Sequence, residues 1–202
     1  LTITGSDSTS GSGVQADIKI ISALGGYAMS VITSITMQNT IGIQEFFNIP
    51  SEVIAGQIEA IVNDVQPNVV KIGMIRSASA VRSITESLKK YPVIISSCGE
   101  VLMSDETINC IKECLLPLCS LVTIKKSSAE YIIGRKLYSA SDMYDAACDI
   151  MKYGCQAVLL QHGTFMAESS MDILVQHGES SCKYLSTTNI CNSYDKHGVS
   201  NN

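Results

Sequence analysis

The chain has 202 residues and a formal net charge of -5, with 46% hydrophobic and 16% charged residues. A composition this apolar is typical of one domain with a packed core and excludes a disordered polar chain. The acidic balance disfavours nucleic acid as a partner, and no apolar run reaches the roughly 18 residues that a membrane span requires.

The N-terminal residues predict a strand, a loop and a helix in that order. Residues 1–4 are apolar and β-branched, and they run into a Gly- and Ser-rich stretch at residues 5–13. Residues 14–24 are predicted to form a helix that ends at Gly25-Gly26. Its expected buried stripe consists of Val14, Ile18, Ile21 and Leu24. This order opens a βαβ unit.

Strands and helices are predicted to alternate along the rest of the chain. A helix after Pro50-Ser51 is expected to bury Ile54, Ile58 and Ile61, and a helix capped by Ser104 to bury Ile108, Ile111 and Leu115. The other expected elements are extended segments at 27–35, 43–49, 69–72, 93–95, 120–123 and 157–161, helices at 78–90 and 141–153, and a hairpin at 173–175 and 183–185. The pattern predicts an α/β fold, with a mostly parallel sheet covered on both faces.

We expect one domain over residues 1–202, since no repeat, linker or low-complexity tract interrupts the pattern. The chain stops at Asn202, where an α/β domain would normally add a covering helix, so we expect that helix to be missing or truncated.

The eight cysteines include Cys110, Cys114, Cys148 and Cys155 within apolar or helical stretches, and none forms a CxxC pair. This usage predicts reduced thiols and a cytoplasmic protein.

A long N-terminal segment carries a family resemblance. Residues 2–40, TITGSDSTSGSGVQADIKIISALGGYAMSVITSITMQNT, closely resemble the start of the hydroxymethylpyrimidine and hydroxymethylpyrimidine phosphate kinases of thiamine biosynthesis, which are ribokinase-like proteins. The likeness continues through Lys71-Ile72-Gly73-Met74. It implies a three-layer α/β/α fold and ATP-dependent phosphorylation of the hydroxymethyl group of 4-amino-5-hydroxymethyl-2-methylpyrimidine or its monophosphate. ATP and Mg²⁺ are the implied cofactors, and a homodimer is a possible assembly.

The resemblance places five substrate-binding positions within residues 5–74. In the family, the Asp after the glycine loop and the Gln of the QNT motif contact the pyrimidine, and these fall on Asp17 and Gln38. An amide both donates and accepts, as an aminopyrimidine edge requires. Met74 matches an apolar position flanking the ring, while Gly5 and Gly11 let the backbone bend beside the ligand. The structural alternatives are a first-turn helix carboxylate for Asp17, a satisfied loop amide for Gln38 and a core side chain for Met74.

The presumed catalytic loop departs from the family pattern. The family has a Gly-Thr-Gly-Cys run at an anion hole for the transferred phosphate, and the matching residues include Gly198, Ser200 and Asn201. Asn201 occupies the position of the base, and a neutral amide cannot abstract a proton. Loss of a positioned base typically slows a reaction by roughly 100- to 10,000-fold.

The nucleotide-binding positions are also substituted. The resemblance assigns Lys125, Gln161 and Gly163 to the nucleotide, and the carboxylate that helps to order magnesium falls on Ser128, unless Glu130 replaces it. The metal ligands are therefore unknown. Lys125 could equally be a surface lysine in a loop, and His162 is expected to be a loop histidine. The loop after residues 93–95 looks shortened, which leaves one wall of the pocket in doubt.

Three functions remain open from the sequence. The first is the pyrimidine kinase described above. The second is a pyridoxal or pyridoxine kinase, because that branch of the superfamily also phosphorylates a heteroaromatic alcohol. The third is a relative that binds the pyrimidine but is catalytically impaired, since the acceptor end is better preserved than the donor end.

Overall fold

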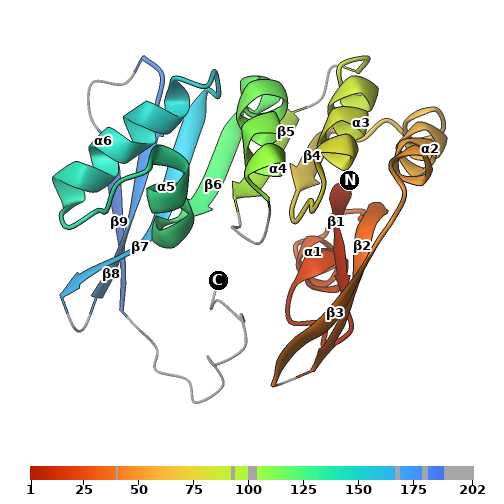
Figure 1. The fold of residues 1–202 in the computed structure, drawn as a ribbon, viewed down its shortest axis with the longest axis horizontal. Helices are drawn as coiled ribbons and strands as arrows, with labels where there is room; N and C mark the ends of the chain where they lie inside the picture. The colour runs from red at the N-terminus through yellow and green to blue at the C-terminus, as the bar shows by residue number, and fades with distance from the viewer. Residues whose placement is uncertain (40, 92–93, 100–103, 167–168, 179–181, 189–202) are drawn as a thin grey trace. The chain divides into compact units, whose positions relative to one another are not determined.

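The structure is a computed structural model that describes residues 1–39, 41–91, 94–99, 104–166, 169–178 and 182–188. The described residues divide into two compact units, one within residues 1–94 and the other within residues 95–188. Each unit combines a sheet with helices (Figure 1). The single domain expected from the sequence stays a prediction.

The first unit has the strand order β3-β2-β1-β4. Strand β1 pairs in parallel with both β2 and β4, while β3 is antiparallel to β2. Helix α1 packs against β1 and β2, while α2 packs against β2 and α3. The elements are β1 (Thr2–Asp7), α1 (Gly13–Ala23), β2 (Ser30–Asn39), β3 (Gly42–Asn48), α2 (Ser51–Val62), β4 (Val69–Ile72) and α3 (Ala78–Leu88).

Aliphatic side chains of the strands and of α2 and α3 form the core of this unit. Ile3, Val31 and Ile72 are completely buried on the strands, and Ile58 and Ile84 are buried on the helices. The prediction that Ile54 and Ile58 of α2 face inward is confirmed, whereas Ile61 is only half-buried and Val62 is buried in addition. Strands buried on both faces need this run of β-branched residues.

The side chain of Gln57 forms hydrogen bonds with backbone groups of β2 in the part of that strand that does not pair with β3. Its amide accepts a hydrogen bond from the Ile32 N–H at 3.1 Å and donates one to the Ile32 carbonyl at 3.2 Å. Pairing with β3 starts at Ser34. A buried backbone without such partners would be unstable, so Gln57 of α2 takes the role of a neighbouring strand.

The predicted buried stripe of α1 is wrong beyond its first turn. Val14 is buried, but Ile18 is 38% exposed and Leu24 is 83% exposed. Only the first part of the helix lies close enough to the strands to be covered, and within the described residues no element covers its last two turns. The spacing of the apolar residues predicts a helix, but it does not show which elements pack against that helix.

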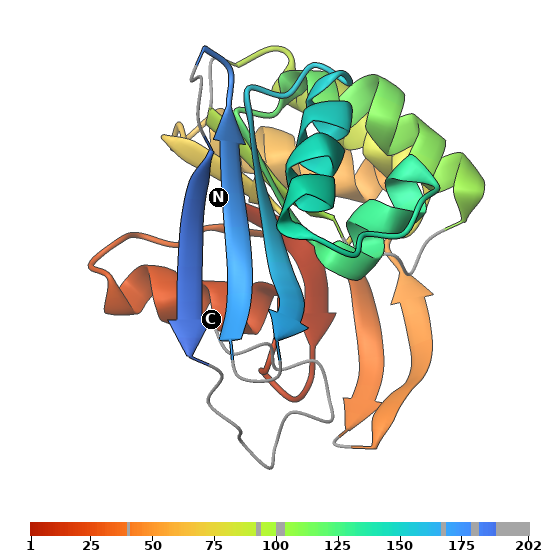
Figure 2. The same cartoon turned by 90° about the vertical axis from the view of Figure 1, so that its left-hand side faces the viewer.

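The second unit has the strand order β5-β6-β7-β8-β9. Strands β5, β6 and β7 are parallel, and β8 and β9 continue as antiparallel neighbours, as Figure 2 shows. The elements are β5 (Ile94–Gly99), α4 (Asp105–Cys110), a π-helical turn η1 (Ile111–Leu115), a 3₁₀ turn η2 (Leu116–Leu118), β6 (Leu121–Lys125), α5 (Lys126–Ile133), α6 (Ala140–Met151), β7 (Ala157–Met166), β8 (Ser169–Gln176) and β9 (Lys183–Thr188).

Local signals explain most helix boundaries in this unit. Ser104 caps α4 by accepting a hydrogen bond from the Thr107 N–H, as predicted, and Ser139 with Asp142 forms a capping box at α6. Ile108 and Leu115 are buried, but Ile111 is half-buried because the helix changes there to a π-helical turn.

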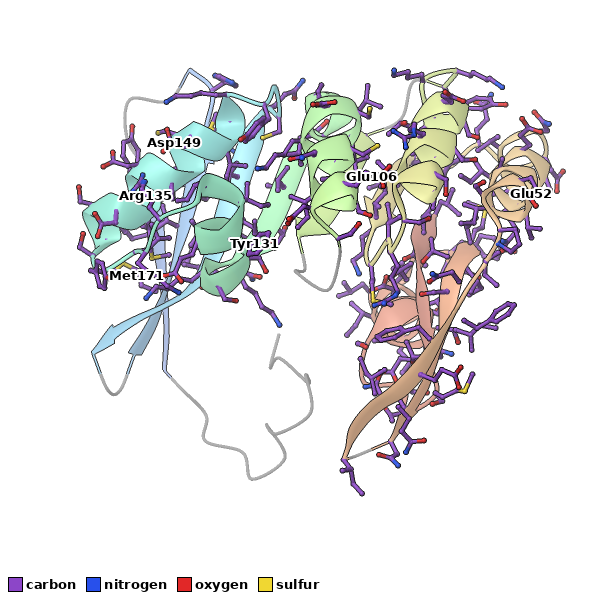
Figure 3. The ribbon with its side chains drawn as sticks, in the orientation of Figure 1. Glu52, Glu106, Tyr131, Arg135, Asp149 and Met171 are labelled. Carbon is purple, nitrogen blue, oxygen red and sulfur yellow. The ribbon has the colours of Figure 1, made fainter. Side chains whose placement is uncertain are left out.

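The helix α5 was not expected from the sequence, which suggested a loop around Lys125 to Ser128. It begins directly after β6 without a side-chain cap and ends at Gly134, whose φ is 73°. The segment that follows it is fixed by an ion pair at 3.1 Å between Arg135 and Asp149 of α6, both labelled in Figure 3.

Candidate functional site

The acceptor side of the candidate site lies at the carboxyl ends of β1 and β2. Asp7, the last residue of β1, fixes the loop that leads into α1. Its carboxylate accepts hydrogen bonds from the N–H and hydroxyl groups of Thr9, both at 2.8 Å, and from those of Ser12 at 2.9 and 2.8 Å. Burial alone would raise the pKa of Asp7, but these four bonds outweigh it and hold the pKa below its ordinary value.

Gln15 reinforces the same loop from the first turns of α1. Its side chain accepts a hydrogen bond from the Asp7 N–H at 3.0 Å and donates one to the Ser6 hydroxyl at 2.7 Å. Sequence reasoning missed both Asp7 and Gln15. A carboxylate directly before a Ser- and Thr-rich turn was the available signal, because such residues bond to backbone groups of tight loops.

Two glycines allow the close packing at this point. Gly13 has a φ of 61°, and a Cβ added there would lie 2.4 Å from the Gly5 carbonyl oxygen. A Cβ at Gly5 would lie 2.7 Å from the Met74 methyl group and 3.0 Å from the Ser34 hydroxyl oxygen. Gly5 therefore brings its backbone against the predicted ring-flanking residue. Gly11 lies in the loop tied by Asp7.

Gln38 lies beside this loop near the end of β2. The Ser8 hydroxyl donates to the Gln38 carbonyl at 2.8 Å. The Thr36 hydroxyl donates to the Ser6 carbonyl at 3.0 Å and lies 3.4 Å from Oε1 of Gln38. Within the described part of the chain, no residue accepts a hydrogen bond from the Gln38 amide nitrogen. The hydrogen bond from Ser8 thus fixes the main chain of Gln38, while the N–H groups of its side-chain amide can donate to a ligand.

Met74 is fixed to β1 and β2 through its backbone. Its N–H donates to the Thr4 hydroxyl at 3.1 Å, and its carbonyl accepts from the Thr33 hydroxyl at 2.8 Å. A Cβ at Gly73 would lie 2.2 Å from the Thr4 hydroxyl oxygen, so the segment after β4 can cross the strands only with glycine there. The structure brings Gly5, Met74 and the loop beside Gln38 together.

Asp17 is not brought to this cluster. One of its carboxylate oxygens accepts from the Thr2 hydroxyl, and the other pairs with the Lys71 ammonium, each at 2.5 Å. Thr2 is the first residue of β1, whereas the loop beside Gln38 follows Asp7 at its end. At about 3.3 Å per residue the two ends of β1 are roughly 16 Å apart. This geometry favours a structural role for Asp17, namely fastening α1 to β1 and β4.

The residues predicted to bind the nucleotide lie in the second unit. Lys125 at the end of β6 pairs directly with Gln161 of β7, so the structure makes two of the predicted residues neighbours. Gly163 lies two residues further along β7, where it pairs with Met171 of β8 just beyond an irregularity in the ladder. Lys125 also precedes the first turn of α5.

Ser128 and Glu130 offer no free carboxylate to a magnesium ion. Ser128 is buried at the position where a carboxylate was expected. Glu130 does not replace it, because its two oxygens accept from the Lys136 ammonium at 2.8 Å and the Leu137 N–H at 3.0 Å. The bond from Lys136, followed by that from Leu137, lowers the pKa of Glu130. Among the described residues, no three His, Cys, Asp or Glu side chains gather as a metal site would require.

The remaining sequence predictions lie outside the described residues. These are the catalytic positions Gly198, Ser200 and Asn201. The segment that looked shortened is described as far as Gly99, where it forms part of β5, and residues 100–103 are not described.

Comparison with known proteins assigns the family. Residues 7–201 match the model of the phosphomethylpyrimidine kinase family. The chain belongs to this family. The hydroxymethylpyrimidine/phosphomethylpyrimidine kinase of Rhizobium meliloti is 34% identical over 181 residues, which are 86% of this chain and 68% of that protein. A probable thiamine biosynthetic bifunctional enzyme of Oryza sativa is 40% identical over 84% of this chain. The chain covers only 32% of that relative, about a third of its length.

Solved structures of this family and of its neighbours share the fold. The phosphomethylpyrimidine kinase from Clostridium difficile 630 has a TM-score of 0.83 and 37% identity, covering 91% of this chain and 81% of that one. An ADP complex of Bacillus subtilis pyridoxal kinase has a TM-score of 0.86 and 27% identity, covering 95% and 75%. The ribokinase-like α/β fold predicted from the sequence is therefore confirmed. No helix in the described ranges is long and apolar enough to cross a membrane.

Proposed function

We propose that this phosphomethylpyrimidine kinase family member phosphorylates the hydroxymethyl group of 4-amino-5-hydroxymethyl-2-methylpyrimidine, or extends its monophosphate, with ATP as the donor. The arrangement of Gln38, Gly5 and Met74 carries this proposal. The Gln38 amide has donors available, and the Met74 thioether offers an apolar surface for a flat ring beside the backbone of Gly5. Asp17 has no part in ring binding in this scheme.

ATP is proposed to bind near Lys125, Gln161 and Gly163 in the second unit. A lysine ammonium suits polyphosphate as a compact point charge. Since Ser128 and Glu130 provide no available carboxylate, magnesium would have to arrive with the nucleotide, and no step is assigned to a metal held by the protein. Gly198 and Ser200 would hold the transferred phosphate, and Asn201 would orient the alcohol without removing its proton.

A pyridoxal kinase activity is the second candidate within the enzyme class. It is supported by the likeness to the Bacillus subtilis pyridoxal kinase, whose structure contains ADP. The higher identity to phosphomethylpyrimidine kinases favours the pyrimidine alcohol. We also propose a homodimer and a cytoplasmic location, the latter because Cys110, Cys114, Cys119, Cys148, Cys155 and Cys182 are free thiols.

A catalytically impaired function is the third candidate, and the carboxylate positions favour it. Ser128 stands at the carboxylate position, and Glu130 is committed to Lys136 and Leu137. Phosphoryl transfer depends mainly on positioning and charge stabilisation, so these changes predict slow turnover and not its complete loss.

Measurement of ADP release with each alcohol tests the proposal. We expect ADP release that depends on the hydroxymethylpyrimidine and is weaker with pyridoxal. Gln38→Ala should weaken pyrimidine binding by about 1 to 3 kcal/mol, as expected when a buried polar partner is lost. Preferential turnover of pyridoxal would replace the pyrimidine assignment, and tight pyrimidine binding with no ADP release would identify a binding protein.

A further inference from the structure

The hydroxyl group of Ser34 is buried and unsatisfied. Ser34 is 1% exposed, and its Oγ forms no hydrogen bond within the described part of the chain. The neighbouring hydroxyls of Thr33 and Thr36 donate to the carbonyls of Met74 and Ser6. A buried hydroxyl without a partner costs stability, which is why such groups are rare in native structures.

This hydroxyl lies at the acceptor side of the candidate site. Ser34 and Thr36 are two residues apart on β2 and therefore face the same side, where Thr36 also lies next to the Gln38 amide. The Ser34 Oγ lies 3.0 Å, and the Met74 methyl 2.7 Å, from the point that a Cβ of Gly5 would occupy. The hydroxyl is thus enclosed by the backbone of Gly5 and the end of the Met74 side chain.

The cover over Ser34 can move. A methionine side chain has three rotatable bonds and fits irregular spaces readily, whereas the Met74 backbone is fixed to Thr4 and Thr33. A flat ring that enters beside Gly5 would displace the Met74 methyl group. The methyl group would then lie against the face of the ring, and the Ser34 hydroxyl would be uncovered. The missing Cβ of Gly5 provides the space for that approach.

We propose that Ser34 is a specificity-determining residue that donates a hydrogen bond to a ring nitrogen of the bound heterocycle. This inference rests on the proposed function. A 4-aminopyrimidine has two ring nitrogens, and one lies next to the amino group, so a single amide can engage both groups. Gln38 takes that edge. The second ring nitrogen then needs a separate donor, and Thr36 cannot serve because its proton goes to Ser6.

A pyridine has one ring nitrogen, so Ser34 would favour pyrimidines over pyridines such as pyridoxal. A site that offers a hydrogen-bond donor rejects the analogue without the acceptor, because the donor is left unpaired.

Ser34→Ala tests the inference by calorimetry and thermal unfolding, with both alcohols as probes. We expect the variant to bind the hydroxymethylpyrimidine roughly 3- to 30-fold more weakly, its pyridoxal affinity to be unchanged, and its ligand-free Tm to rise because the unsatisfied hydroxyl is gone. Thr85→Val is the matched control. It removes a buried hydroxyl that is bonded to the Val81 and Arg82 carbonyls, so it should lower Tm and leave pyrimidine affinity unchanged.

The outcomes separate this inference from the proposed function. If the wild-type protein binds the pyrimidine and Ser34→Ala binds it equally well, the role of Ser34 is overturned and the proposed function stands. A lower Tm for the ligand-free Ser34→Ala variant would also overturn it, because the hydroxyl would then have a partner inside the protein. If the wild-type protein binds no pyrimidine, the proposed function fails and the inference with it.

Discussion

Asp7 and Asp17 show that two carboxylates close together in the sequence perform separate tasks. Asp7 accepts four hydrogen bonds from the loop after β1, and Asp17 fastens α1 to Thr2 and Lys71. Both groups organise the first unit at opposite ends of β1.

Asp7 should make the first unit sensitive to acid. Its folded-state pKa is lowered, so the ionised form stabilises the fold above the unfolded-state pKa of about 4. That stabilisation is lost as the pH falls through the lower folded-state value. Circular dichroism can monitor unfolding by urea between pH 7 and pH 2 and so give the free energy of unfolding at each pH. Asp7→Asn should be less stable than the wild-type protein at pH 7, and its free energy of unfolding should decline less as the pH falls. An identical acid dependence in the two proteins would contradict this role.

Asp17→Ala should lower the stability of the fold and leave the affinity for the pyrimidine nearly unchanged. The variant loses the Thr2 hydrogen bond and the Lys71 ion pair, and because the Lys71 side chain is 37% exposed we expect a loss of only about 1 to 2 kcal/mol. Calorimetry should give nearly wild-type pyrimidine affinity for a variant that remains folded. A large loss of affinity with unchanged stability would restore the ring contact implied by the family resemblance.

The sequence grouped Asp17 with Gln38, Met74 and Gly5 as predicted substrate-binding residues, whereas the structure pairs Asp17 with Thr2 and Lys71. A helix period of 3.6 residues does not say toward which end of the neighbouring strand a side chain points. The partners of Asp17 lie 15 and 54 positions away in the chain, and such long-range pairs leave no local pattern.

Among the elements, the β2–β3 hairpin carries Gln38 and Ser34 of the proposed pocket. Thr36 on β2 pairs directly with Phe46 on β3, so the two side chains share a face of the hairpin. The guanidinium carbon of Arg76 lies 3.5 Å from the centre of the Phe46 ring. Arg76 follows Met74 by two residues, so this contact joins the hairpin to the segment after β4.

Arg76→Ala should loosen the hairpin. Cation–π contacts contribute roughly 0.5 to 2 kcal/mol, so hydrogen exchange of the β3 amides should accelerate by about 2- to 30-fold. Lys90→Ala is the control, since it removes only an exposed ion pair with Glu59 and should leave β3 unchanged. Unchanged exchange in the Arg76 variant would show that the ring contact does not hold the hairpin.

Most elements followed from hydrophobic periodicity and capping residues, and the exceptions have physical causes. Helix α5 begins at Lys126 without a capping side chain, so its start carries no local signal. At the end of α1 a regular apolar pattern predicted burial that the structure does not show. Leu24 is exposed, because no described element covers it.

On the scale of the whole chain, two buried thiols report the integrity of the second unit. Burial, with a smaller contribution from Cys155, raises the pKa of Cys119 to about 12, and burial raises the pKa of Cys155 to about 11. Only roughly one Cys119 thiol in 10,000 is ionised at pH 8, and the thiolate is the reactive form.

Alkylation at pH 8 should therefore spare Cys119 and Cys155 in the native protein and modify them once urea unfolds the second unit. The half-buried Cys114 and Cys182 serve as internal references and should react first. Mass spectrometry of the modified peptides gives the order. Early modification of Cys119 in the native protein would contradict a packed second unit.

The family and the fold could be predicted from the sequence because residues 2–40 match the kinases in order and spacing. The nucleotide end could not be predicted to the same depth. There the resemblance puts Lys125 and Ser128 at positions where other residues were expected, and only the structure shows that Glu130 pairs with Lys136.

A crystal soaked with the hydroxymethylpyrimidine would show where the ring binds. We predict a ring beside Gly5, with its amino edge at the Gln38 amide and the Met74 thioether against one face. A ring bound elsewhere, or a space filled by the Met74 and Ser34 side chains with no ligand at saturating concentration, would contradict it.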